Sequence, residues 1–131
     1  MTNQNIHHVL AMCIERKRQV LWTTPNRVSA HEMLRQCADA ATNVIKQDVQ
    51  RIRIARGQES IAFTNGSQIN FVSRNNESSR GRTVDVLLID EPNDLDECAK
   101  AVEMVLPLDD VLIAHRGGPW HRLVLAATPA A

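Results

Sequence analysis

Apolar residues recur at intervals of three and four along two stretches in the first third of the chain. The first set predicts an amphipathic helix over residues 5–18: Ile6, Val9, Leu10, Cys13 and Ile14. The second set predicts a helix that starts near Ser29: Ala30, Met33, Leu34, Cys37, Ala38, Ala41 and Ile45. Ser29 and Glu32, three residues apart at the start of this stretch, have the spacing of a capping box.

Two further segments have the composition of β structure. Residues 19–23 are closed by Thr24-Pro25-Asn26 and predict a buried strand that leads into a turn. Residues 60–73 predict a hairpin with Asn65-Gly66 at its tip and two apolar residues on each arm: Ile61 and Phe63, then Ile69 and Phe71. A two-residue Asn-Gly turn would put the apolar pairs on opposite faces. We therefore expect a three-residue loop, 65–67, which pairs Phe63 with Ile69 and Ile61 with Phe71.

The second half of the chain contains one nearly unbroken apolar run, residues 84–89. It ends abruptly in Asp90-Glu91-Pro92, which is typical of a central parallel strand that meets its C-terminal loop. We expect an exposed loop over residues 73–83, a helix over 94–106 and a last buried strand over 123–127. Strands that alternate with helices predict an α/β fold, with a mainly parallel sheet, flanking helices and one β-hairpin. The length suits a single domain, residues 1–131.

Charge is balanced over the whole chain but unevenly distributed along it. Lys plus Arg and Asp plus Glu each number 15, so there is no net field to drive indiscriminate binding to nucleic acid. Residues 51–82 nevertheless carry six arginines against Glu59 and Glu77, and residues 85–110 carry nine acids against Lys100 alone. One basic and one acidic region are therefore expected.

Cysteine usage and hydropathy bear on the cellular compartment. Cys13, Cys37 and Cys98 are far apart and lie among apolar neighbours, which favours buried thiols in a reducing compartment over disulfides or a zinc site. The N-terminus has no basic-then-apolar signal pattern, and no apolar run approaches the roughly 18 to 20 residues that span a bilayer. We expect a cytoplasmic protein with no membrane partner.

Two adjacent carboxylates follow the apolar run, and this arrangement indicates nucleotide chemistry. Leu87-Leu88-Ile89-Asp90-Glu91 has the form of a Walker B strand, in which apolar residues seat the strand in a sheet and two acids emerge at its edge. In such a site the first carboxylate holds the magnesium shell, and the second orients or deprotonates the water that attacks the γ-phosphate. The alternative interpretation is structural, because acids also favour the N-terminus of a helix.

Four blocks extend this pattern over nearly all of the chain: Val20-Leu21-Trp22-Thr23-Thr24-Pro25-Asn26, Phe63-Thr64-Asn65-Gly66-Ser67-Gln68-Ile69, Ser79-Arg80-Gly81 and Leu123-Val124-Leu125-Ala126-Ala127-Thr128-Pro129. In this order they resemble four parts of the large terminase subunit of tailed phages and related viruses. These parts are the strand after the first ATPase helix, the Asn-Gly-Ser hairpin, the Arg-Gly before Walker B and the coupling-motif strand. The resemblance implies a P-loop NTPase-like core of the additional-strand catalytic-glutamate type.

The resemblance also implies roles for single residues. Asp90 would serve magnesium, Glu91 would be the catalytic carboxylate, and ATP with magnesium would be the cofactors. Arg80 would be an arginine finger that reaches the nucleotide of a neighbouring subunit, and Thr128 would be the coupling residue that senses the nucleotide state. The alternatives are a solvated loop arginine at Arg80 and a plain turn residue at Thr128.

The sequence lacks one motif that this chemistry requires. Phosphate binding in this class uses Gly-x-x-x-x-Gly-Lys-[Ser/Thr], whose backbone N–H groups wrap the phosphates. The first glycine here is Gly57, and residues 5–18 match the helix that ordinarily follows the Lys-Thr. We therefore expect this polypeptide alone to bind ATP very poorly and to be inactive without a phosphate loop from elsewhere.

Two functions follow from these patterns. The first is a partial ATPase domain of a phage terminase large subunit, which takes part in ATP-driven DNA packaging in the bacterial host cytoplasm. Its implied partners are other terminase subunits, the portal and double-stranded DNA, and its implied assembly is a homo-oligomeric ring. The second is a non-catalytic terminase-like module that binds motor subunits or DNA through Arg74, Arg80 and Arg82. A strand-exchange or helicase-type ATPase is a third possibility, and the hairpin and Arg-Gly spacing argue against it.

Overall fold

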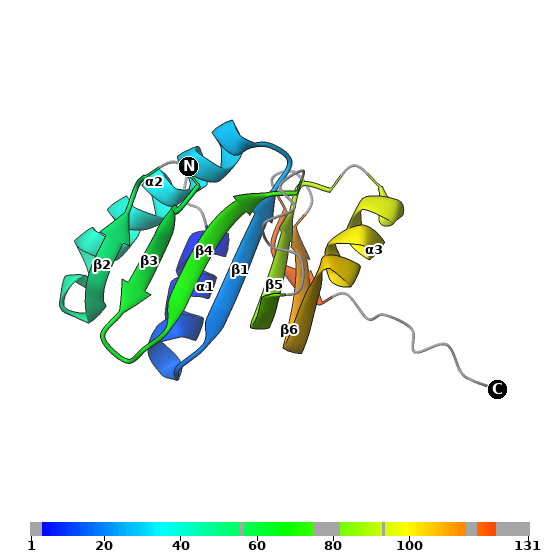
Figure 1. The fold of residues 1–131 in the computed structure, drawn as a ribbon. Helices are drawn as coiled ribbons and strands as arrows, with labels where there is room; N and C mark the ends of the chain where they lie inside the picture. Colours follow the sequence, from blue (N-terminus) through cyan, green and yellow to red (C-terminus); the bar gives the residue numbers. More distant parts are fainter. Residues whose placement is uncertain (1–3, 56, 75–81, 93, 115–117, 123–131) are drawn as a thin grey trace.

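The computed structural model describes residues 4–55, 57–74, 82–92, 94–114 and 118–122. The elements in these ranges (Figure 1) are α1 Gln4–Glu15, β1 Gln19–Thr24, α2 Arg27–Val44, the short 3-10 helix η1 Lys46–Asp48, β2 Val49–Arg53, β3 Ser60–Phe63, β4 Gln68–Ser73, β5 Arg82–Asp90, α3 Leu95–Met104, β6 Val105–Ala114 and β7 His121–Arg122. The predicted helices correspond to α1, α2 and α3. The predicted strands before α2 and before the paired acids correspond to β1 and β5.

The described strands form one sheet in the order β2-β3-β4-β1-β5-β6-β7. At its centre β4, β1, β5 and β6 run parallel, but β2–β3, β3–β4 and β6–β7 are antiparallel pairs. The predicted α/β class is therefore confirmed, whereas the predicted mainly parallel sheet is wrong, because the sheet is mixed. Short loops join β2 to β3 and β3 to β4, and a short loop allows only antiparallel pairing.

Helices lie against both faces of the sheet, with α1 and α2 on one side and α3 on the other (Figure 1). Alternate residues of β1 point to the two sides: Val20 and Trp22 belong to the core beneath α1 and α2, and Leu21 to the core beneath α3. Both sides of β1 are buried, which explains its continuous apolar pattern.

The hairpin β3–β4 exists as predicted, but its register differs from the prediction. The loop is residues 64–66, because the Phe63 N–H donates to the Ser67 carbonyl and Gly66 has a left-handed φ of 93°. Ile61 lies opposite Ile69, so pairing is shifted by two residues from the expected one. A two-residue shift keeps the same side chains on the same face, so the apolar pattern could not distinguish the registers.

The start of α2 also differs from the prediction by one turn. Asn26, not Ser29, is the N-cap: the Asn26 side chain accepts from the Ser29 N–H, and the Ser29 hydroxyl accepts from the Asn26 N–H. Ser29 therefore closes the capping box from its third helical position rather than opening it. The helix thus begins two residues after Pro25, directly behind the end of β1.

Strands β2, β6 and β7 were not predicted. Pro107 and Asp110 interrupt the apolar pattern of β6, and β2 alternates only weakly because most of its residues are exposed. The predicted strand over residues 123–127 lies outside the described residues. None of the helices in the described ranges is long and apolar enough to cross a membrane.

Candidate functional site

The last residues of the four parallel strands lie at the same edge of the sheet. β1 ends at Thr24, β4 at Ser73, β5 at Asp90 and β6 at Ala114. In open α/β sheets, ligands bind outside the carboxyl ends of the parallel strands, so this edge is where a site is expected. The predicted acid pair, Asp90 and Glu91, stands there on the central strand β5.

Asp90 points to the side of the sheet covered by α1 and α2. Trp22 Nε1 donates a hydrogen bond of 3.2 Å to Asp90 Oδ2, and Trp22 is itself fully buried. Partial burial raises the pKa of Asp90 above its ordinary value. The Trp22 hydrogen bond and the positive charge of Arg74 act against this rise, and Glu91 adds to it. A carboxylate whose charged form is disfavoured in this way gains stability from a nearby cation.

Two tryptophans connect Asp90 to the first turn of α1. The Trp22 and Trp120 rings meet edge to face with centroids 5.2 Å apart. Trp120 Nε1 donates to the Asn5 carbonyl at 3.0 Å, and the Trp120 N–H donates to the Asn5 side chain at 3.0 Å. Asp90 therefore faces the same side of the sheet as the N-terminus of α1, where backbone N–H groups favour anions.

Glu91 has an unusual main chain. Its φ is 51°, in the left-handed region, which costs a non-glycine residue roughly 1–2 kcal/mol. The Glu91 N–H donates to the Ala114 carbonyl at 2.8 Å and continues the pairing of β5 with β6. Pro92 disfavours the right-handed helical conformation in the residue before it. The exposed Glu91 side chain thus leaves the sheet in a direction set by its backbone.

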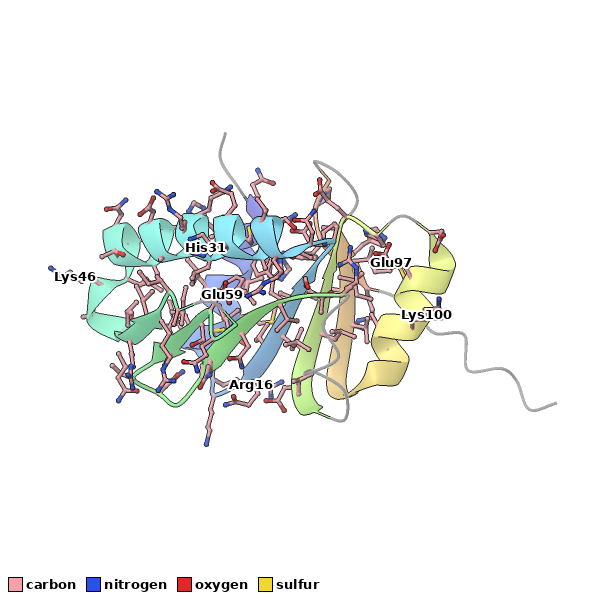
Figure 2. The ribbon with its side chains drawn as sticks, turned by 45° about the horizontal axis from the view of Figure 1, so that its top comes forward. Arg16, His31, Lys46, Glu59, Glu97 and Lys100 are labelled. Atoms are coloured by element: carbon pink, nitrogen blue, oxygen red, sulfur yellow. The ribbon has the colours of Figure 1, made fainter. Side chains whose placement is uncertain are left out.

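Arg74 joins three elements at this edge, and sequence reasoning missed this role. Its guanidinium donates to Glu97 Oε1 on α3 at 3.0 Å, to the Thr23 carbonyl on β1 at 2.9 Å and to the Glu91 carbonyl at 3.1 Å. The side chain is only 6% exposed. Figure 2 shows Glu97 on the part of α3 that lies at this edge. Arg74 is the first residue after a buried strand, and that position was the one available signal.

The predicted Asn-Gly-Ser block lies at the opposite edge of the sheet and caps α1. The Asn65 side chain and the Ser67 hydroxyl both donate to the Cys13 carbonyl, at 2.7 and 2.8 Å. Ser67 Oγ also accepts from the Arg18 N–H at 2.9 Å. These bonds satisfy carbonyls that the last turn of a helix leaves without partners. The block therefore fastens the hairpin to the C-terminal end of α1. It lies at the start of β4, whereas the acid pair lies at the edge of the sheet where β4 ends.

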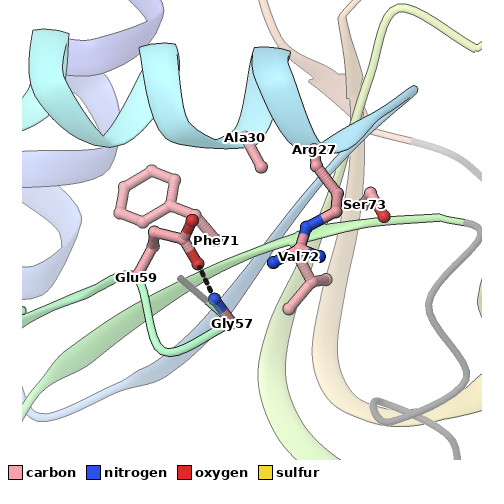
Figure 3. Close-up of a pocket in the computed structure, with 7 residues that line it drawn as sticks. All are labelled: Arg27, Ala30, Gly57, Glu59, Phe71, Val72 and Ser73. Atoms are coloured by element: carbon pink, nitrogen blue, oxygen red, sulfur yellow. Dashed lines mark hydrogen bonds between the residues drawn. The ribbon is translucent and has the colours of Figure 1, made fainter. Parts of the chain in front are cut away.

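A second concave region lies beside the N-terminus of α2. Its inner pocket holds only about 10 Å³, and Glu59 accepts there from the Gly57 N–H at 3.0 Å (Figure 3). An adjoining groove of about 540 Å³ is of ligand size, and His31 Nδ1 lies 3.7 Å from Glu59 Oε2 on its wall (Figure 2). Its lining is Arg27, Val28, His31, Glu32, Ile54 and Glu59. Asp90 and Glu91 do not line it.

The family model described as terminase large subunit, T4likevirus-type, N-terminal, matches residues 7–101. The chain belongs to this family. The match covers β1, the Asn-Gly-Ser hairpin and the acid pair, and it confirms the predicted terminase resemblance. No curated protein and no solved structure matched the chain.

Two of the four predicted site residues of this terminase segment have no described structure. Arg80 and Thr128 lie outside the described residues. The predicted loop over residues 73–83 is described only at its ends, where β4 ends at Ser73 and β5 already begins at Arg82. Asp90 and Glu91 come together at the sheet edge, where Trp22 donates to Asp90 and Arg74 donates to the Glu91 carbonyl. Within the described ranges, no three His, Cys, Asp or Glu residues gather as a metal site.

Proposed function

We propose that this terminase segment is part of the ATPase domain of a DNA-packaging motor and carries its hydrolytic strand. The observation that supports this most directly is the placement of Asp90. It stands at the carboxyl end of a central parallel strand and faces the side of the sheet where α1 begins. A carboxylate in this position lies on the same side of the sheet as a helix N-terminus, and helix N-termini favour phosphate.

The acid pair fits a magnesium nucleotide. Mg²⁺ in nucleotide sites is held by one or two carboxylates, with substrate phosphates and waters as the other ligands, so a larger protein cluster is unnecessary. Asp90 would hold the ion, and Trp22 would keep its carboxylate oriented. Bound magnesium would neutralise charge on the transferring phosphate. Glu91, exposed next to Asp90, would orient the attacking water and accept its proton.

Arg80 and Thr128 complete the proposal by family resemblance. Arg80 would reach the nucleotide of a neighbouring subunit in a homo-oligomeric ring, where an inserted arginine is worth on the order of 10³ to 10⁵ in rate. Thr128 would couple the nucleotide state to movement. Other terminase subunits, the portal and double-stranded DNA are the proposed partners. The phosphate loop would come from sequence outside these 131 residues and would lead into α1.

Turnover of ATP with magnesium tests the proposal. The chain as it stands should show almost none, and the chain joined to an N-terminal phosphate loop should hydrolyse ATP. Glu91→Gln in the joined chain should abolish turnover, whereas the exposed control Glu15→Gln should not change it. If the joined chain is inactive and Glu91→Gln changes nothing, the catalytic assignment is wrong.

A non-catalytic module that binds motor subunits is the second candidate, and the groove beside α2 favours it. Val28 and Ile54 on its walls are 80% and 65% exposed, and Glu59 also lines it. Exposed apolar side chains around a groove are typical of a docking surface. The role foreseen for Arg74 in such binding does not fit, because its guanidinium is occupied within the fold.

Pull-down against an intact large subunit, a small terminase subunit and a portal separates the two candidates. If the chain is a binding module, it should associate with one of these partners whether or not ATP is present. The double variant Val28→Ser, Ile54→Ser should abolish this association. Repeating the pull-down at raised salt identifies binding that depends on exposed basic residues. Loss of association in the Glu91→Gln chain alone would contradict the module and favour the motor.

A further inference from the structure

We propose that Arg74 is a positioning residue for Glu91, which it fixes through the main chain. This inference rests on the proposed function of Glu91. The guanidinium does not approach Glu91 as a charge partner. It donates Nη2–H to the Glu91 carbonyl oxygen at 3.1 Å, and so it acts on the backbone that directs the carboxylate.

The three nitrogens of Arg74 each serve a different part of the fold. Nε is bonded to Glu97 on α3, Nη1 to both the carbonyl and the hydroxyl of Thr23 on β1, and Nη2 to Glu91. The Arg74 N–H itself donates to the Thr24 carbonyl at 2.9 Å, so its main chain is also fixed against β1. The planar guanidinium places its donors at set angles, and a lysine has no such fork.

Glu91 needs such a restraint because its backbone conformation is unfavourable. A left-handed glutamate persists only where its surroundings hold it, and here both of its main-chain polar groups are bonded. The Glu91 N–H is held by the Ala114 carbonyl, a backbone partner that substitution does not remove. The Glu91 carbonyl is held by the side chain of Arg74. Of these two restraints, only the second depends on the identity of a side chain.

Glu97 has a separate part in this arrangement. It lies on α3, accepts from Nε at 3.0 Å and balances the charge of an arginine whose side chain is 6% exposed. If Arg74 only tied α3 to the sheet, the Glu97 contact would be the important one. If Arg74 positions Glu91, the Nη2 contact matters more. Glu97→Gln weakens the first contact and leaves the second, so it is the control that separates a structural role from a positioning role.

NMR on this chain tests the geometry without any nucleotide. The three-bond coupling between the amide and α protons reports φ of Glu91. Arg74→Lys and Arg74→Gln should move this coupling and the Glu91 carbon shifts away from left-handed values, whereas Glu97→Gln and the exposed control Arg35→Gln should leave them unchanged. Unchanged Glu91 signals in folded Arg74 variants would overturn the inference. If both variants fail to fold, Thr23→Val replaces them, because it removes one of the two acceptors of Nη1. This variant should shift the Glu91 signals in the same direction by a smaller amount. Unchanged Glu91 signals would again overturn the inference.

Kinetics of the chain joined to a phosphate loop test the consequence. Arg74→Lys should lower kcat roughly 10- to 100-fold with KM nearly unchanged, the cost of a misplaced catalytic group. Glu97→Gln should retain most of kcat. If Glu91→Gln abolishes turnover but Arg74→Lys keeps full kcat, the positioning role is wrong and the proposed function stands. If Glu91→Gln has no effect, the proposed function fails, and the NMR result still decides whether Arg74 sets the Glu91 backbone.

Discussion

The indole of Trp22 donates its Nε1–H to Asp90 Oδ2 across 3.2 Å, from one central strand to the end of the next. Trp22 is fully buried, so the bond connects the core beneath α1 and α2 to a carboxylate that borders solvent. It stabilises the ionised form of Asp90 and orients one of its two oxygens. The proposed magnesium ligand is thus anchored by a residue that also forms the core.

Trp22→Phe should raise the pKa of Asp90 further, because the hydrogen bond that favours its ionised form is lost. The free energy of unfolding at neutral pH should fall by about 1–3 kcal/mol, the cost of leaving a partly buried acceptor without its donor. A ¹³C titration of the Asp90 carboxyl, together with urea unfolding, measures both effects. Trp120→Phe is the control, since it keeps a ring near Trp22 but removes the bond to Asn5 instead. An unchanged Asp90 titration in Trp22→Phe contradicts the assignment.

Asp90→Asn should make the fold more stable at neutral pH. Burial raises the pKa of Asp90 in the folded chain, so its ionised form is disfavoured there. This cost to stability is absent at pH values below 3.8, the ordinary pKa that Asp90 has in the unfolded chain. It grows as the pH rises from there to the raised pKa of the folded chain, and it is complete above that pKa. The melting temperature of the variant should therefore exceed that of the wild type at pH 7, and the difference should vanish in acid. A variant less stable than wild type at pH 7 would show that Asp90 serves the fold and not a ligand.

Ser67→Ala should destabilise the chain by about 1–3 kcal/mol. The Ser67 hydroxyl is buried, accepts from the Arg18 N–H and donates to the Cys13 carbonyl. Its loss leaves the Arg18 N–H without its acceptor, while Asn65 still donates to the Cys13 carbonyl. Urea unfolding measures the change. Thr42→Ala, on the exposed surface of α2, is the matched control and should change stability by less than about 0.5 kcal/mol. Equal effects at the two positions would contradict the capping role.

The thiols should be inert in the native protein. Burial raises the pKa of Cys13 to about 12 and that of Cys37 well above its usual range, so almost no thiolate is present at pH 8. Cys98 is also buried. Mass spectrometry after a short exposure to iodoacetamide should find the chain unmodified, and the same exposure in guanidinium chloride should modify all three cysteines. Rapid native labelling of Cys13 or Cys37 would contradict this packing.

Much of the fold could be predicted because each residue of a helix or strand faces either the core or solvent, and this leaves a regular pattern of apolar residues in the sequence. Val9 and Leu34 are buried on helices whose other faces are solvated, so their spacing indicated α1 and α2. Leu87 and Leu88 point to opposite cores, so an unbroken apolar run indicated a central strand. The register of the hairpin could not be predicted, since a shift of two residues leaves Ile61 on the same face.

The candidate site was only partly predictable for a related reason. Asp90 and Glu91 carry their chemistry in their residue type and position at the end of a strand. Arg74 looks like other polar residues near a loop, and its importance depends on Thr23 and Glu97, which are 51 and 23 residues away from it in the chain. Contacts at such separations have no local pattern. The same is true of Trp120, whose link to Asn5 spans 115 residues.

Strand β4 begins beside the fastening of α1 at Ser67 and ends beside Arg74, and Figure 1 shows it running the length of the sheet. Its six residues span roughly 20 Å at the usual rise of an extended chain. All six residues pair with β1, and residues 68–70 also pair with β3, so the strand stretches very little and transmits displacement from one end to the other. A force applied to the hairpin tip would therefore reach the acid pair through β4 and the bond from Arg74 to the Glu91 carbonyl, without passing through α1 or α2.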